Sequence, residues 1–142
     1  MECKVSWFSG MSFVAETGSG HLLAMDGAPE AGGRNLAPRP METVLAGTGG
    51  CTAFDVVMIL QKSRQDVTGC EVSMSAERAE TDPKVFTRIH MHFTLKGRGL
   101  KPDVVARAIG LSAEKYCSAS IMLAKTATIT HDWEIVDETA HT

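Results

Sequence analysis

The 142-residue chain lacks the features that would assign it to several specialised classes of protein. It has no run of basic residues, and its formal net charge is −3, so neither nucleic acid nor an anionic membrane surface is an expected partner. The N-terminus, MECKVSWFSGMSF, contains no long apolar segment, so we predict no signal peptide and expect a cytoplasmic protein. No internal repeat is present. We therefore predict one domain over residues 1–142, with a frayed polar tail over residues 137–142.

Cysteine is scarce and is not spaced for a metal or for a disulfide framework. The four cysteines are Cys3, Cys51, Cys70 and Cys117. No CxxC pair occurs and no Cys/His cluster has zinc spacing, so we expect no metal and no cofactor. Free thiols are the expected state in a protein that is not secreted. A metal centre built from His90, His92 and His131 is a hypothesis with little support, because a third ligand is not evident beside the His-x-His pair.

The segment 40–64 is predicted to be a long central helix. Pro40 suits the first position of a helix, and a basic turn at the other end complements the helix C-terminus. Apolar side chains and threonines recur between them at spacings of three and four. Glu42 and Asp55 interrupt the segment and its middle is rich in glycine, so it is not predicted to span a membrane.

Gly49 and Gly50 lie directly before Cys51 within this predicted helix. Each glycine costs roughly 1 kcal/mol in a helix relative to alanine, so we expect a backbone or a substrate to approach closely there. The Cys51 thiol would then be accessible. The alternative is that Cys51 is a small buried hydrophobic residue in a tightly packed helix.

The remaining elements predict an α+β fold. Alternating residues indicate that the strands 67–77 and 85–96 are antiparallel neighbours, and Cys70 is expected in the core. Further strands are predicted over 3–15, with a break at Gly10, and over 21–25 and 126–136, and further helices from Pro102 onward and over 119–125.

Two cysteine motifs resemble a known family. PMETVLAGTGGC at residues 40–51 and LSAEKYCSAS at residues 111–120 are similar to motifs of the osmotically inducible protein C (OsmC) / organic hydroperoxide resistance (Ohr) family. MDG at residues 25–27 and CTAFDVVMILQKSRQDV are most similar to its YhfA-like branch. The resemblance spans residues 4–136. It implies antiparallel sheets wrapped around two central helices, in an intertwined cytoplasmic homodimer with active sites at the subunit interface.

The resemblance also implies a chemistry. The chain would be a thiol-dependent peroxidase, an oxidoreductase of the oxidative stress response, in which Cys51 attacks an organic hydroperoxide. Cys117 would resolve the resulting sulfenic acid as a Cys51–Cys117 disulfide, which a dithiol such as a lipoylated protein would reduce. Apolar residues are expected to surround Cys51 and to favour lipid or aromatic hydroperoxides; they are Met41, Val44, Leu45, Phe54, Met58 and Met122.

The sequence departs from the peroxidase pattern at two positions. The turn that carries an activating arginine in the peroxidase members reads TGSGH at residues 17–21, and the carboxylate expected after Pro40 comes one position later, as Glu42. Glu42 is assigned to the catalytic site by the resemblance, but it could equally favour the helix dipole alone. The candidates that could replace the usual ion pair are Arg34, Arg39, His21 and Glu114. An alternative function is therefore a non-catalytic or redox-sensing homodimer that binds a small hydrophobic ligand in the two-cysteine pocket.

Overall fold

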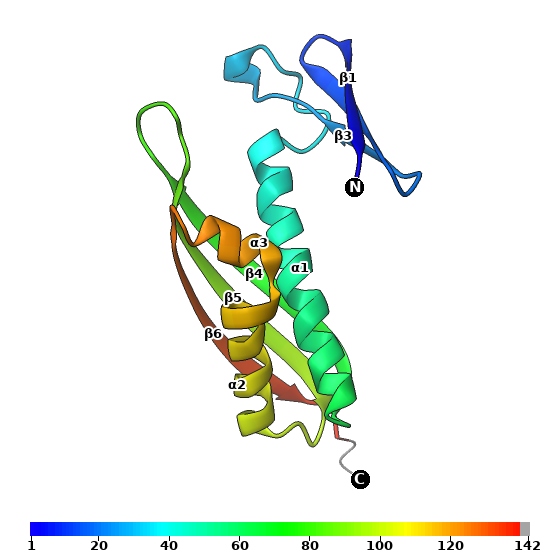
Figure 1. Cartoon of the computed structure of the whole chain (residues 1–142), viewed down its shortest axis with the longest axis vertical. Helices are drawn as coiled ribbons and strands as arrows, with labels where there is room; N and C mark the ends of the chain where they lie inside the picture. Colours follow the sequence, from blue (N-terminus) through cyan, green and yellow to red (C-terminus); the bar gives the residue numbers. More distant parts are fainter. Residues whose placement is uncertain (140–142) are drawn as a thin grey trace. The chain divides into compact units, whose positions relative to one another are not determined.

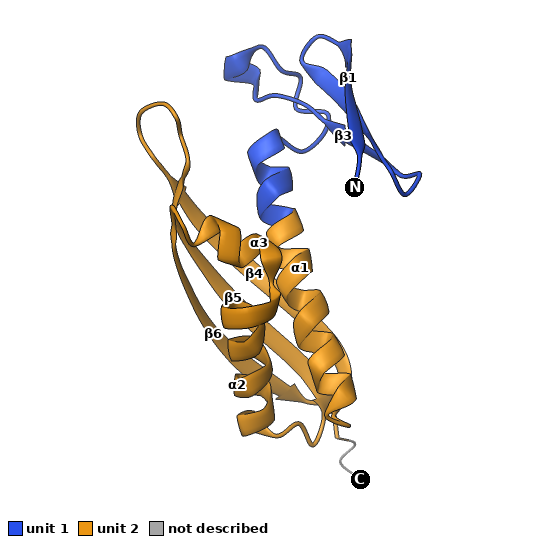
Figure 2. Ribbon diagram, viewed as in Figure 1, with its two compact units in different colours: residues 1–46 blue, residues 47–142 orange. Residues whose placement is uncertain are grey.

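A computed structural model of the chain describes residues 1–139, which fall into two compact units (Figure 2). The first unit is Met1–Ala46 and the second is Gly47–Thr142, of which residues 140–142 are not described. Helix α1 (Pro40–Lys62) begins in the first unit and continues into the second. Its start at Pro40 confirms the prediction made from the proline, and it ends at Lys62, two residues before the predicted end at residue 64.

The first unit is a three-stranded antiparallel meander, as predicted. Its strands are β1 (Cys3–Ser9), β2 (Ser12–Thr17) and β3 (Leu22–Met25), in that order in the sheet. Gly10 adopts the left-handed φ of +55° in the tight turn between β1 and β2, a conformation that glycine takes without steric cost. A loop with one short 3₁₀ helix, η1 (Pro29–Ala31), leads to α1.

The second unit contains a mixed sheet with the order β4–β5–β6. Its strands are β4 (Asp66–Arg78), β5 (Phe86–Arg98) and β6 (Thr128–Asp137). β4 and β5 are antiparallel as predicted, with Val72 opposite Phe93. β6 lies parallel to β5, with Ile129 opposite Ile89, so the prediction of wholly antiparallel sheets was wrong for this pair. The cause is the helical segment between the two strands, since a crossover of this length allows parallel neighbours.

Helices cover one face of this sheet (Figure 1). After β5 the chain forms α2 (Pro102–Leu111), the π-helical segment η2 (Ser112–Tyr116) and α3 (Ser118–Leu123). The interruption expected between the two helices is thus a π-helical turn. The core lies between helices and sheet, and its largest fully buried apolar side chains are Phe93, Leu60, Ile89, Leu95, Ile109, Val56 and Val105.

α1 is long and apolar enough to cross a membrane when judged by length and composition alone. Within the second unit it carries the buried residues Thr52, Asp55, Val56 and Leu60, and 33% of its most apolar window is buried in the single chain. Gly49 is buried in α1, and a Cβ atom there would come within 2.7 Å of the Met74 sulfur on β4. The close approach expected at both glycines is therefore found only at Gly49, where a side chain of the sheet makes it; a Cβ atom on Gly50 would have no neighbour within 4 Å.

The end of the chain is more ordered than expected. β6 extends to Asp137, and the backbone N–H of Glu138 donates to the carbonyl of Gly97 over 2.7 Å. The Thr68 hydroxyl donates to the Glu138 carboxylate over 2.6 Å. The predicted frayed tail therefore does not begin at residue 137, and residues 140–142 lie outside the described residues.

Candidate functional site

Cys51 and Cys117 lie together in the second unit. Cys51 is in the middle of α1, and Cys117 follows η2 and precedes α3. Their sulfur atoms lie within 4.8 Å of each other, and neither cysteine is in a disulfide. Cys117 is fully buried, whereas Cys51 is partly exposed. Two residues 66 positions apart in the sequence thus form one dithiol site.

A carboxylate completes this cluster. Asp55 lies one helical turn after Cys51, which places both side chains on the same face of α1. One oxygen of Asp55 and the two cysteine sulfur atoms all lie within 4.8 Å of one another. Asp55 is only 9% exposed, and within residues 47–139 no lysine, arginine or histidine forms an ion pair with it.

Two hydroxyl groups link this carboxylate to the second helix. The Ser112 hydroxyl donates to Asp55 Oδ2 over 3.1 Å and lies 2.8 Å from the Thr52 hydroxyl. Ser112 has a single hydroxyl proton, so its bond to Asp55 makes Thr52 the donor in the other bond. Both hydroxyl residues are buried. The chain of hydrogen bonds Thr52–Ser112–Asp55 therefore joins α1 to the α2–η2 junction beside the dithiol.

Cys117 caps the short helix α3. Its sulfur accepts hydrogen bonds from the Ser120 backbone N–H at 3.4 Å and from the Ser120 hydroxyl at 3.0 Å. Burial raises the pKa of the Cys117 thiol above its ordinary value, and the Cys51 thiol adds to this increase, whereas the two bonds from Ser120 oppose it. The buried cysteine is therefore held as a thiol more firmly than a free cysteine would be.

A cavity of about 250 Å³ lies beside two neighbours of the cysteines, although neither Cys51 nor Cys117 is in its wall. Thr52, next to Cys51 in the chain, and Ser120, which bonds to Cys117, both contribute to its wall. The rest of the wall is mainly apolar and comes from β5, β6 and the helices; it consists of Met91, Phe93, Ile109, Ala113, Glu114, Ala124, Ile129 and His131.

The apolar residues predicted to surround Cys51 are not those that line this cavity. Phe54 and Met58 instead line a separate groove beside Cys70, and Met122 is 68% exposed. Helical spacing predicted the apolar face of α1, whereas β5, β6 and the later helical segments, all far away in the sequence, supply most of the cavity wall.

Comparison with known proteins identifies the family of this chain. Residues 32–132 match the family model of OsmC-like proteins. The chain belongs to the OsmC-like family. Protein YhfA of Escherichia coli strain K12 is 52% identical over 136 residues, which cover 96% of this chain and 98% of YhfA. The resemblance inferred from the two cysteine motifs, including its YhfA-like branch, is thereby confirmed.

Solved structures extend the likeness of this OsmC-like chain to more distant proteins. A hypothetical protein from Aquifex aeolicus VF5 has a TM-score of 0.84 at 28% identity, over 96% of each chain. An organic hydroperoxide resistance protein OsmC from Legionella pneumophila has a TM-score of 0.69 at 16% identity, over 94% of this chain and 95% of its own. At 16% identity, the likeness to the Legionella pneumophila protein shows only a shared fold.

The other residues expected at the site have local partners. The Glu42 carboxylate accepts a hydrogen bond from the Arg39 backbone N–H over 2.9 Å, which is half of a capping box at the start of α1. Arg34 donates to the Ser9 hydroxyl over 2.8 Å, and His21 Nδ1 lies 3.0 Å from the Ser19 hydroxyl. These three contacts lie within the first unit. A catalytic role for Glu42 therefore stays a prediction, and its capping contact supports the alternative reading.

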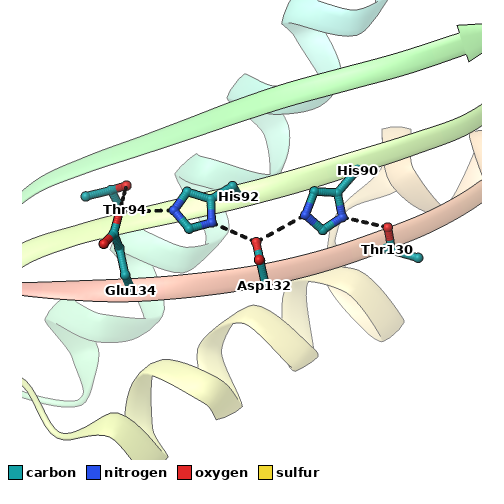
Figure 3. A network of polar contacts seen from close by, with 6 residues as sticks. All are labelled: His90, His92, Thr94, Thr130, Asp132 and Glu134. Atoms are coloured by element: carbon teal, nitrogen blue, oxygen red, sulfur yellow. Dashed lines mark hydrogen bonds and ion pairs between the residues drawn. The ribbon is translucent and has the colours of Figure 1, made fainter.

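The three histidines do not form one metal centre. His90 and His92 lie on the face of β5 away from the cavity, and His131 lines the cavity on the opposite face of the sheet. His90 and His92 share the Asp132 carboxylate at 3.2 and 2.7 Å, and Glu134 binds the other ring nitrogen of His92 at 3.1 Å (Figure 3). The hypothesis that all three bind one metal ion was wrong, because successive strand residues point to opposite faces.

Sequence reasoning missed Asp55, Ser112, Thr52 and Ser120 as members of the site. One signal was present, because Asp55 lies four residues after Cys51 on a predicted helix and so shares its face. The three hydroxyl residues carried no such signal. Their role depends on how α2 and η2 pack against α1, which no local pattern specifies.

Proposed function

We propose that this OsmC-like protein is a thiol-dependent peroxidase that reduces organic hydroperoxides. The observation that carries the proposal is the proximity of the Cys51 and Cys117 sulfur atoms, which lie within 4.8 Å of each other. A partly exposed thiol beside a buried one suits the two roles, since the first must meet the substrate and the second must meet only the first. Two structural relatives, from Legionella pneumophila and Bacillus subtilis, are described as organic hydroperoxide resistance proteins.

The proposed reaction has two steps. The Cys51 thiolate attacks the terminal oxygen of the hydroperoxide, the O–O bond breaks, and the alkoxide takes a proton and leaves as an alcohol. Cys51 is then a sulfenic acid. The sulfur of Cys117 attacks the sulfur of Cys51, a disulfide forms and water leaves, taking the oxygen with the Cys117 proton. An external dithiol, such as a lipoylated protein, would reduce the disulfide by exchange.

The apolar cavity near the cysteines is an argument for an organic hydroperoxide as the substrate. Its wall is mostly apolar, with Met91, Phe93 and Ile129 from the sheet, so it suits the hydrocarbon part of a lipid or aromatic hydroperoxide. Hydrogen peroxide has no such part and would gain nothing from this wall. We therefore expect faster oxidation by an organic hydroperoxide than by hydrogen peroxide.

We also propose that the functional protein is an intertwined homodimer. The first unit exposes large apolar side chains, with Trp7 at 69%, Phe8 at 74% and Leu22 at 72%. Exposed apolar groups concentrated on one small unit are typical of a surface that another chain covers. Light scattering coupled to gel filtration would measure the mass in solution, and a monomer at micromolar concentration would contradict the proposal.

The test of the peroxidase function uses the reduced protein. It is mixed with cumene hydroperoxide or with hydrogen peroxide, and the products are identified by intact mass and peptide mapping. We expect a loss of two hydrogens that joins Cys51 to Cys117, and recovery with dihydrolipoamide. Cys51→Ser should abolish turnover, Cys117→Ser should allow Cys51 to over-oxidise, and Cys70→Ser is the matched control. Thiols that react no faster than free cysteine would refute the proposal.

The same assay tests Glu42. A catalytic role predicts that Glu42→Gln slows oxidation of Cys51 by the organic hydroperoxide, whereas a role in capping alone predicts a change in stability without a change in that rate. Asp132→Asn, on the outer face of the sheet, is the control for a charge change away from the thiols.

A redox-sensing or ligand-binding protein is the second candidate function. Two observations favour it: the pKa of Cys117 is raised by burial, and within residues 47–139 no cationic side chain donates a hydrogen bond to either thiol. A thiolate is the reactive form of cysteine, so a site without an activating cation would react slowly. A Cys51 pKa near the free value of about 8.5, measured by the pH dependence of alkylation, would favour this function over catalysis.

A further inference from the structure

The cluster of Cys51, Asp55 and Cys117 has the chemistry of a metal site. Two thiols and a carboxylate converge from α1 and from the residue after η2, and their ligand atoms lie within 4.8 Å of one another. Three ligand atoms bound to one tetrahedral zinc ion would lie about 3.5 to 3.8 Å apart, given Zn–S bonds of about 2.3 Å and Zn–O bonds of about 2.0 to 2.2 Å. The three groups therefore need to approach one another by about 1.3 Å at most.

The surroundings of these groups suit a bound cation. Asp55 is 91% buried, and within residues 47–139 it has no cationic partner, a costly position for a carboxylate. Ser112 holds one of its oxygens. Ser120 donates two hydrogen bonds to the Cys117 sulfur. Hydrogen bonds of this kind orient ligands and stabilise their charge in metal sites.

We propose that the reduced protein binds Zn²⁺ through Cys51, Cys117 and Asp55, with the fourth coordination position left open. Two thiolates and one carboxylate favour a borderline-soft ion, and they exclude Mg²⁺ and Ca²⁺, which need several oxygen ligands. Binding displaces the two thiol protons. A disulfide between the same cysteines removes both sulfur ligands, so the site exists only in the reduced protein.

The metal site has a consequence for the dithiol. A thiolate whose electron pair is bound to zinc is a weaker nucleophile, so Zn²⁺ should slow the attack of Cys51 on a hydroperoxide. This consequence rests on the proposed peroxidase function, whereas the binding site itself does not. The two are separated by measuring metal binding directly, without any substrate.

The experiment titrates the reduced full-length protein with Co²⁺ and records the absorption spectrum. Thiolate-to-cobalt charge-transfer bands together with the strong visible bands of tetrahedral Co²⁺ are expected at one equivalent, and Zn²⁺ should abolish them by displacement. Loss of a residue that hydrogen-bonds to a metal ligand weakens metal binding roughly ten- to hundredfold. Asp55→Asn removes a ligand itself, so it should weaken Co²⁺ binding by at least as much. Cys51→Ser and Cys117→Ser should lose most of the charge-transfer intensity, and Cys70→Ser should keep it.

A second measurement uses only the wild-type protein, so it does not depend on whether the variants fold. Wild-type protein is alkylated with iodoacetamide with and without Zn²⁺, and each cysteine is followed by peptide mass spectrometry. Zn²⁺ should protect Cys51 at least tenfold and should leave the exposed Cys3 unaffected. Absence of the cobalt bands in the wild type, or equal protection of Cys3 and Cys51, would overturn the metal site. Bands without any peroxidase activity would leave it standing and would refute the proposed function instead.

Discussion

Removal of the Ser112 hydroxyl should destabilise the protein strongly, because it breaks a buried link between α1 and the α2–η2 junction. In Ser112→Ala, Asp55 loses a bond of 3.1 Å and Thr52 loses the acceptor at 2.8 Å. A hydrogen bond to a charged group contributes about 1.5 to 3 kcal/mol, and a bond between neutral groups about 0.5 to 1.5 kcal/mol. The free energy of unfolding should therefore fall by about 2 to 4 kcal/mol.

The assay is urea unfolding at pH 7 and at a fixed protein concentration, since the stability of an oligomer depends on concentration. Ser118→Ala is the matched control, because Ser118 is exposed in the neighbouring α3 and should change stability by less than about 0.5 kcal/mol. In an Asp55→Ala background the cost of Ser112→Ala should fall by about 1.5 to 3 kcal/mol, which is the coupling between the two residues. A Ser112→Ala variant as stable as the Ser118→Ala control would refute the reasoning.

Three further predictions concern other parts of the molecule. Gly49→Ala should raise the free energy of unfolding in urea by less than the roughly 1 kcal/mol that helix propensity gives, because its Cβ would lie 2.7 Å from the Met74 sulfur and this flexible side chain would have to shift; in a Met74→Ala background the full gain should appear. Phe93→Ala should cost about 3 to 5 kcal/mol in the same assay, because Phe93 is 1% exposed; a cost below about 1.5 kcal/mol would contradict this. The third concerns pH. Bonds to Glu134 and Asp132 raise the pKa of His92 above 6.5. The contribution of protonated His92 to the free energy of unfolding is therefore complete below pH 6.5 and is lost as the pH rises through the raised pKa. His92 in turn lowers the pKa of Glu134 below 4.5, so that contribution is lost as the pH falls through the lowered value. The stability difference between wild type and His92→Gln should be largest between about pH 4.5 and 6.5, and a difference that does not vary with pH would contradict the assignment.

The sequence was sufficient for most elements of the fold, because their signals are local. Pro40 and the apolar spacing after it predicted α1, and alternation predicted β4 and β5. The direction of β6 was not predictable in the same way. Alternation states which side chains share a face, but it does not state which strand lies beside them or whether the pair is parallel.

The site was predictable only in part for a related reason. The two cysteines were found because each lies in a motif that resembles a family, and the structure places their sulfur atoms within 4.8 Å of each other. Their polar surroundings were not found. Asp55 faces the same way as Cys51 by helix geometry, but the group that holds it, Ser112, is 57 residues further along the chain.

The π-helical segment explains why the position of Cys117 could not be derived from its neighbours. The Cys117 backbone N–H donates to the Ser112 carbonyl over 2.8 Å, a bond between residues five apart that defines a π turn. Nothing in the residues between them, such as Glu114 and Lys115, disfavours an ordinary helix. Ser112 therefore acts twice, since its carbonyl places Cys117 and its hydroxyl places Asp55. Ser112 thus holds both Cys117 and Asp55, the one carboxylate of the cluster described in residues 47–139. A substitution at Ser112 should therefore alter the distance between the two thiols and the position of the Asp55 carboxylate together.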